Sequence, residues 1–510
     1  MKLQSALAPI AVLISLSGLL RCPPVASAEG ESDSPVRLYV REVPFKIFGK
    51  EVKVLAIEQE SGAQGLNPKT SDGFNVEVVN QLKEPTSIHW HGIVLPSLMD
   101  GVPFVSQEPI PPGATSRYHF PLKQSGTYWM HSHFGLQEQL LASAPLILQT
   151  AEQQARADEQ YVVLLSDYST KPPSQILKQL KAGMKGMGGM SKMPPAQKLV
   201  TQKWDDQTHG FVSAVVAAEL PDTDIQYDAL IANRRTFDDP DVFRVNPGHT
   251  VLLRIIAGSA ATNFFVNTGT LTALLIATDG KDVLPVSGNF FQLGIAQRID
   301  LLVKIPEQGG VFPIVAQGEG TKQQCGVVLA TEGEAIPKIP VEAEFATARL
   351  DNTQELRLTA KNPLPEKAID RSLPCVLGGT MTKYDWTING SAYPERNSLE
   401  VKEGERVEIA LRNETGMTHP MHLHGHDVEV TEIDGKKVSG ALRDTLIVPP
   451  NSTIKVIFDA NNPGIWAFHC HILYHALVGM FTVVKYAGAD TPFWQPEKTL
   501  SELNGAGSER

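Results

Sequence analysis

The chain has 510 residues, enough for about three domains at roughly 150 residues per domain. Its hydrophobic share of 42% and charged share of 20% are typical of a globular protein with substantial buried cores. The formal net charge is −11 and no long basic run occurs, which argues against nucleic acid as a partner.

Residues 1–28 have the pattern of a signal peptide. An early positive charge precedes an apolar stretch at residues 6–20, and Ala26-Ser27-Ala28 stand before the expected cleavage site. The apolar stretch is short for a membrane span, and no other of that apolar length follows. We therefore expect an exported protein, periplasmic or extracellular, with no membrane span in the mature chain. Cleavage as a lipoprotein at Cys22 is the alternative, although Arg21 is a poor neighbour for it.

Two strand patterns then recur three times along the chain. Residues 35–150 contain FNVEVVNQLKEPTSIHWHG and PPGATSRYHFPLKQSGTYWMHSH. Residues 155–335 contain HTVLLRIIAGSAATNFFVNTG and GIAQRIDLLVKIPEQGGVFPIVAQ, which lack the paired histidines at their ends. Residues 340–488 contain ERVEIALRNETGMTHPMHLHG and PPNSTIKVIFDANNPGIWAFHCH, and residues 489–510 form a tail. Period-2 alternation between Pro and Gly turns predicts an all-β chain of three homologous sandwich domains.

One segment of the second domain breaks this pattern. It begins as a helical stretch, SQILKQLKAGM, and becomes rich in Gly and Met. Its methionines recur at every third residue, and the glycines between them disfavour a stable helix. These methionines are Met184, Met187, Met190 and Met193.

Ten of the 14 histidines fall in four tight clusters. On a strand, residues i and i+2 point to one face, so each His-x-His pair aims two imidazoles the same way. Four such pairs, two in each outer domain, could converge if those domains met face to face. Eight imidazoles are too many for one metal and suit a cluster of three. The remaining histidines, His119, His209, His249 and His426, are interpreted as ordinary polar residues.

A second metal signal surrounds Cys470. One thiolate (Cys470), two imidazoles (His419 and His475) and one thioether (Met480) make the ligand set of a blue copper site for one-electron transfer. Cys470 also lies between His469 and His471, so an electron that arrives at the thiolate site is two peptide units from the histidine cluster. A cluster that collects four electrons has O₂ as its obvious acceptor.

The histidine motifs resemble those of multicopper oxidases, a family that includes laccases, bilirubin oxidases and bacterial copper-efflux or copper-resistance oxidases. The motifs are HWHG, GTYWMHSH, HPMHLHGH and HCHILYHALVGM, and the resemblance extends over the whole mature chain. It implies three consecutive cupredoxin-like Greek-key β-sandwiches and four copper ions: one type 1, one type 2 and two type 3. The implied ligands are His419, Cys470, His475 and axial Met480 for type 1; His89 and His422 for type 2; and His91, His131, His133, His424, His469 and His471 for type 3.

Reduction of O₂ to water needs protons at a buried site, and a carboxylate is the natural relay. Asp100 stands at the spacing after HWHG where bacterial relatives have such an acid, although Asp100-Gly101 also reads as a simple turn. Many of those relatives carry a second acid just after the last type 1 histidine, where this chain has Ala476. Glu108 is a candidate substitute. Cys325 and Cys375 either form a disulfide or remain two buried thiols.

The electron donor is less determined. Thioether sulfur suits Cu(I), so the Met184–Met193 run could gather cuprous ions, or it could be a hydrophobic lid. An exposed edge of His475 could instead accept electrons from phenols. We expect an oxidase of broad donor range for phenols, Cu(I) or Fe(II). The alternatives are a dedicated cuprous oxidase in copper tolerance and a non-catalytic copper-binding scaffold, which the retained ligands disfavour. The oligomeric state is left open.

Overall fold

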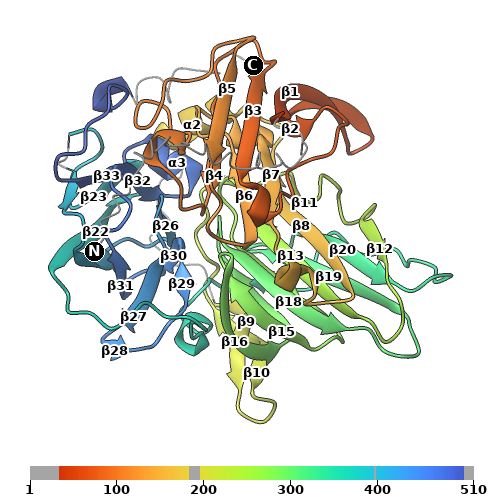
Figure 1. Ribbon diagram of the computed structural model, residues 1–510. Coiled ribbons are helices and arrows are strands. Elements are labelled where there is room, and N and C mark those ends of the chain that lie inside the picture. The colour runs from red at the N-terminus through yellow and green to blue at the C-terminus, as the bar shows by residue number, and fades with distance from the viewer. Residues whose placement is uncertain (1–33, 183–195, 396–397, 499–510) are drawn as a thin grey trace, which may run out of the picture. The chain divides into compact units, whose positions relative to one another are not determined.

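The computed structural model describes residues 34–182, 196–395 and 398–498. Strands predominate, and only short helices interrupt them (Figure 1). The expected signal peptide, Cys22, the run Met184–Met193 and the end of the expected tail lie outside the described residues. Among the described helices, none is long and apolar enough to cross a membrane.

The first sandwich consists of a sheet in the order β2-β1-β3-β5 and a sheet in the order β4-β6-β7. In β3, every second residue is buried, and apolar residues occupy the buried positions Phe74, Val76 and Val78. The strands are β1 (Val36–Ile47), β2 (Lys50–Gln59), β3 (Phe74–Asn80), β4 (His89–His91), β5 (Thr115–Phe120), β6 (Gly126–His131) and β7 (Ser143–Leu148). Two 3₁₀ turns between them, Ser97–Met99 and Glu138–Leu140, adjoin the histidine motifs.

The middle sandwich has a sheet in the order β11-β8-β13-β18-β15-β16-β10-β9-β21 and a sheet in the order β12-β20-β19-β14-β17. Its strands are β8 (Glu159–Tyr168), β9 (Gln197–Asp205), β10 (Gly210–Ala218), β11 (Ala229–Ala232), β12 (Asp241–Arg244), β13 (Thr250–Ala257), β14 (Phe264–Asn267), β15 (Ala273–Thr278), β16 (Lys281–Gly288), β17 (Phe290–Leu293), β18 (Arg298–Lys304), β19 (Val311–Gly318), β20 (Gln324–Ala330) and β21 (Ala346–Thr347). Helix α1 (Ala151–Gln154) precedes β8, and α2 (Pro173–Lys181) follows it. The helix expected at the start of the insertion is therefore present as α2.

The third sandwich has a sheet in the order β23-β22-β25-β31-β27-β28, with β29 also paired to β27, and a sheet in the order β24-β33-β32-β26-β30. Its strands are β22 (Arg371–Thr380), β23 (Asp385–Ile388), β24 (Leu399–Val401), β25 (Arg406–Asn413), β26 (His419–Leu423), β27 (Val428–Ile433), β28 (Lys436–Lys437), β29 (Leu442–Arg443), β30 (Thr445–Val448), β31 (Thr453–Asp459), β32 (Ile465–Cys470) and β33 (Phe481–Tyr486). Helix α3 (Leu473–Leu477) connects β32 to β33.

The same pairing occurs in all three sandwiches. The first strand runs parallel to a later strand in β1·β3, β8·β13 and β22·β25. That later strand then pairs antiparallel with the next, in β3·β5, β13·β18 and β25·β31. The repeat in the sequence is therefore a repeat of topology, and the all-β, three-sandwich prediction is confirmed.

The first and third sandwiches share one hydrophobic core, whereas the middle sandwich has a separate one. One buried cluster runs from the first sandwich, with Val40 and Trp129, into the third, with Leu411 and Val456. The middle sandwich has its own core around Leu253 and Phe291. The first and third sandwiches thus pack against each other, as convergence of their histidines requires.

Candidate metal centre

Two strand pairs position the eight histidines of the His-x-His motifs. β4 pairs antiparallel with β6, which places His89 opposite His131. β26 pairs with β32, which places His422 opposite His469. Because the motif residues alternate along each strand, their imidazoles leave the sheet on one face and enter the space between the first and third sandwiches.

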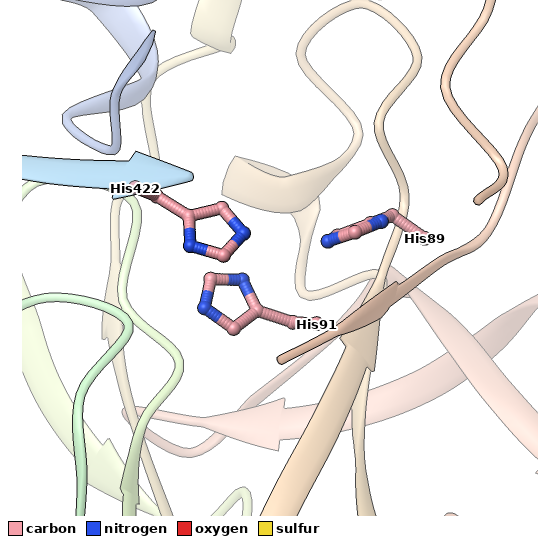
Figure 2. A group of neighbouring side chains, drawn as sticks. All are labelled: His89, His91 and His422. Carbon is pink, nitrogen blue, oxygen red and sulfur yellow. The ribbon is translucent and has the colours of Figure 1, made fainter. Parts of the chain in front are cut away.

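Ring nitrogens from both sandwiches meet in that space. Figure 2 shows His422 facing His91 and His89, and the His91 and His422 rings stack with their centroids 3.7 Å apart. Elsewhere in the cluster, the Nε2 atom of His469 lies 3.0 Å from Nε2 of His424 and 3.4 Å from Nε2 of His133. The histidines form three sets, and within each set the ligand atoms lie within 4.8 Å of one another. These sets are His89, His91 and His422; His91, His131 and His471; and His133, His424 and His469.

The outer ring nitrogens are held by protein oxygens, whereas inner ones are left without a partner. Nδ1 of His89 contacts the Asp100 carbonyl at 2.8 Å, and Nδ1 of His422 contacts the Asp444 carbonyl at 2.9 Å. His91 is oriented the other way, with Nε2 held by a carboxylate oxygen of Asp444 at 3.1 Å. In the described structure, both ring nitrogens of His471 and four further nitrogens of the cluster are buried without a hydrogen-bond partner: Nε2 of His89, Nδ1 of His91, Nε2 of His131 and Nε2 of His422. Buried polar atoms are normally paired, so these orphaned nitrogens fit metal ligands.

Most of the cluster imidazoles favour the neutral form. Burial lowers the pKa of six of them well below the usual value for histidine, and neighbouring histidines lower it further. These six are His91, His131, His133, His422, His424 and His471. A neutral ring has a lone pair to offer, which is the form that binds a transition metal.

Asp100 lies at the edge of this cluster. Its side chain is fully buried, and its Oδ2 atom is 2.9 Å from Nδ1 of His424. Its own carbonyl holds His89, so one residue orients a ligand of each outer sandwich. The alternative interpretation of Asp100-Gly101 as a turn also agrees with the structure, because Gly101 has φ +81° and an added Cβ would clash with the Ile88 carbonyl. The turn places the Asp100 carboxylate next to His424.

A second buried acid, Glu138, was not singled out in the sequence. Its Oε2 atom is 3.1 Å from Nδ1 of His131, and burial followed by the charge of Asp167 raises the pKa of Glu138 well above its usual value. Glu138 and Ala476 line the same cavity of about 30 Å³ beside the histidines. Glu108, the expected substitute, is exposed and bonds to Gln495 at 3.0 Å, so that expectation is wrong.

Cys470, His419 and His475 form a second, compact site. The Sγ atom of Cys470 is 3.7 Å from Nδ1 of each histidine, and the two Nδ1 atoms are 3.2 Å apart. Met480 is fully buried next to them, and its carbonyl accepts the Cys470 amide at 3.0 Å. Thr415 holds Nε2 of His419 at 2.7 Å, which turns Nδ1 toward the sulfur. The donor set fits copper.

The outer edge of His475 is buried, contrary to the expectation of an exposed edge. Nε2 of His475 is 2.8 Å from Oδ2 of Asp224, whose side chain is only 2% exposed. Asp224 in turn lines an open cavity of about 520 Å³, together with Tyr227, Met381 and Tyr384. Helix α2 forms part of the same wall. One carboxylate thus lies between this cavity and His475, and the sequence alone did not single out that residue.

The histidines outside the motifs have ordinary surroundings. His119 and His209 are exposed, and His249 pairs with Glu159 at 2.8 Å. His426 is buried but contacts the Tyr486 hydroxyl at 2.6 Å. Their expected roles as polar residues thus agree with their positions. Cys325 and Cys375 are both buried and are not joined in a disulfide, which favours the alternative of two buried thiols.

Comparisons with known proteins agree with this architecture. Three multicopper oxidase family models match residues 40–152, 159–333 and 370–490. The chain is 33% identical over 419 residues to the multicopper oxidase MmcO of Mycobacterium tuberculosis, covering 81% of this chain and 79% of that protein. It is 27% identical to copper resistance protein A of Escherichia coli, covering 91% and 94%. Among solved structures, it resembles Fet3p, a multicopper oxidase that functions in iron import, with a TM-score of 0.72, 20% identity and coverage of 92% and 93%.

Three cupredoxin-like sandwiches, with a thiolate–imidazole site beside a histidine cluster, define a copper-dependent oxidoreductase. The chain belongs to the multicopper oxidase family.

Proposed function

We propose that the chain holds four copper ions and couples one-electron oxidation of phenolic or metal-ion donors to the reduction of O₂ to water. His419, Cys470 and His475 would hold type 1 copper, together with the buried Met480. His89 and His422 would hold type 2 copper, and the other six histidines the type 3 pair: His91, His131, His133, His424, His469 and His471. Bound there, copper supplies one-electron transfer at the first site and multi-electron reduction of O₂ at the second.

One observation carries this proposal. The end of β32 places Cys470 in the thiolate site, while its neighbours His469 and His471 reach the histidine cluster. The two sites are therefore joined by adjacent peptide units of one strand. This connection is what an enzyme needs if it collects electrons singly and uses them together, and a copper store does not need it.

Replacing Cys470 with Ser tests the connection. We expect the blue absorbance and the turnover to be lost while the histidine cluster keeps its copper. Cys325→Ser is the matched control, because Cys325 is an equally buried thiol in the middle sandwich and should leave colour and rate unchanged. Blue absorbance that survives in Cys470→Ser would refute the assignment.

The donor would bind in the cavity in front of Asp224. The carboxylate can attract a cation or accept the proton that a phenol loses when it is oxidised. Relatives include iron multicopper oxidase fer1 of Mycosarcoma maydis and laccase-2 of Botryotinia fuckeliana, so their names cover both donor classes. A steady-state survey of phenols, Cu(I) and Fe(II) on copper-loaded protein decides between a broad and a narrow range.

A dedicated cuprous oxidase is the second candidate function. Helix α2 and Met381 line the donor cavity, and the methionines Met184, Met187, Met190 and Met193 follow α2 directly in sequence. Deleting residues 184–193 should abolish Cu(I) oxidation while phenol oxidation stays intact or rises. Unchanged Cu(I) turnover would eliminate this candidate.

Residues 1–28 would direct export, so the enzyme would act in the periplasm or outside the cell. N-terminal sequencing of the protein recovered from a fractionated host is expected to begin at Glu29. A start at Cys22 would indicate a lipoprotein instead.

A further inference from the structure

The middle sandwich supplies no histidine to the cluster, yet one of its side chains reaches to within one residue of it. Arg298, the first residue of β18, is fully buried. Its guanidinium forms a bidentate ion pair with Asp444 of the third sandwich, with Nη1–Oδ1 at 2.8 Å and Nη2–Oδ2 at 2.5 Å. Its Nε donates to the Thr127 carbonyl of the first sandwich at 3.1 Å. One side chain therefore ties all three sandwiches together.

Asp444, which Arg298 holds in place, contacts two histidines of the cluster. Its Oδ1 atom contacts Nε2 of His91 at 3.1 Å, and its carbonyl contacts Nδ1 of His422 at 2.9 Å. Thr445 also donates its hydroxyl to Oδ1 at 2.9 Å, which fixes the carboxylate further. Asp444 thus sets the rotation of one ring from the first sandwich and one from the third.

His91 depends on this contact because of its orientation. A proton on Nε2, donated to Asp444, leaves the lone pair on Nδ1, and Nδ1 is the buried inner atom without a partner. If the ring were released, it could rotate or exchange its proton, and Nδ1 would no longer point into the cluster. Second-layer partners of this kind change metal affinity about 10- to 100-fold.

Arg298 and Asp444 pack closely against the backbone next to His91. Gly92, next to His91, has φ +85°, and an added Cβ would lie 2.4 Å from Oδ2 of Asp444 and 2.5 Å from Nη2 of Arg298. The planar, bidentate fork of arginine fits a carboxylate held so closely, and the single ammonium of lysine does not reproduce it.

We propose that Arg298 is a positioning residue for the trinuclear centre: through Asp444 it fixes His91 and His422, so the middle sandwich, which contributes no histidine to the cluster, is required for the cluster to bind its metal. The proposal rests on the copper assignment given above. Arg298 has no contact with the thiolate site in the described structure, so type 1 copper should not depend on it.

The test compares two buried arginines. Arg298→Met should lose type 2 and type 3 copper while it keeps type 1, as judged by copper per chain, the type 2 electron paramagnetic resonance signal and the blue absorbance. Arg254→Met is the control, because Arg254 is also buried, pairs with Asp300 at 2.8 Å and contacts the Thr127 hydroxyl at 2.9 Å. No hydrogen bond found for Arg254 among the described residues reaches a histidine.

Two further variants protect the test against misfolding. Asp444→Asn keeps the shape of the side chain and should lose the same copper ions as Arg298→Met. The double variant removes both charges together, so no new unpaired charge is buried, and it should be no worse than either single change. Arg298→Lys should restore the copper content only in part.

The outcomes separate this proposal from the one on which it rests. If the unaltered protein bound no copper in the histidine cluster, the copper assignment itself would fail. If the unaltered protein were complete and Arg298→Met and the double variant kept full type 2 and type 3 signals, the positioning role of Arg298 would be overturned. Equal copper loss in Arg254→Met would likewise overturn it, because any buried ion pair would then suffice.

Discussion

At the scale of single residues, carboxylates decide how the buried imidazoles point. Asp100, Asp444 and Glu138 each lie within about 3 Å of the outer nitrogen of a cluster histidine, and Asp224 does the same for His475. A carboxylate in this position fixes the tautomer and makes the ring a better ligand. Replacing one should alter chemistry more than stability, and two such changes can be predicted.

Asp100→Asn should slow the reduction of O₂ about 100-fold, because a group that can carry a proton is removed beside the cluster. The blue absorbance should persist, since Asp100 contacts no residue of the thiolate site in the described structure. Stopped-flow reoxidation of the reduced enzyme measures this step directly. Glu108→Gln, at an exposed acid, is the control; an unchanged rate in Asp100→Asn would mean that protons travel another way.

Asp224→Asn should impair the donor side alone. The rate with phenols or metal ions should fall about 10-fold or more because the carboxylate in front of His475 is lost. Reoxidation by O₂ and the copper content should be unchanged. Asp228→Asn is matched, because Asp228 lines the same cavity but bonds to Ser169 and Thr170. Equal losses in both variants would show a general effect of charge in the cavity.

At the scale of elements, the strands and the metal pairs could be predicted because both follow from local pattern. Period-2 alternation and Pro/Gly turns reveal strands, and His-x-His on a strand fixes which side chains share a face. Glu138 and Asp224 could not be predicted, because each lies on a connecting segment and reaches its histidine only through packing. Asp444 lies between two short strands with no motif to mark it, and its partner Arg298 is far away in the sequence.

Cys325 and Cys375 lie on β20 and β22, strands that pack in different cores. Because Cys325 and Cys375 are both buried, a thiol reagent should react with them only after unfolding. A reducing agent should leave the unfolding temperature unchanged. A drop in that temperature on reduction would indicate a disulfide after all.

At the scale of the whole molecule, copper should stabilise the outer sandwiches rather than the middle one. Their shared core closes over histidines whose inner nitrogens have no other partner, whereas the middle sandwich has a core of its own. Binding to the folded state alone stabilises it by mass action, about 4 kcal/mol at a thousandfold excess over Kd. Removing copper by chelation should lower the temperature of the calorimetric transition of the outer sandwiches and leave that of the middle sandwich unchanged. An equal shift of all transitions would contradict this prediction.

The histidine cluster takes four of its histidines from residues 89–133 and four from residues 422–471. During synthesis, His89 and His131 emerge long before His422 and His469, and neither half forms the histidine cluster alone. Metal binding by the complete cluster would therefore follow translation through His471, the last of its eight histidines in the sequence. A ribosome stalled before β32 would hold a nascent chain in which the histidines of the first sandwich lack His469 and His471 as partners.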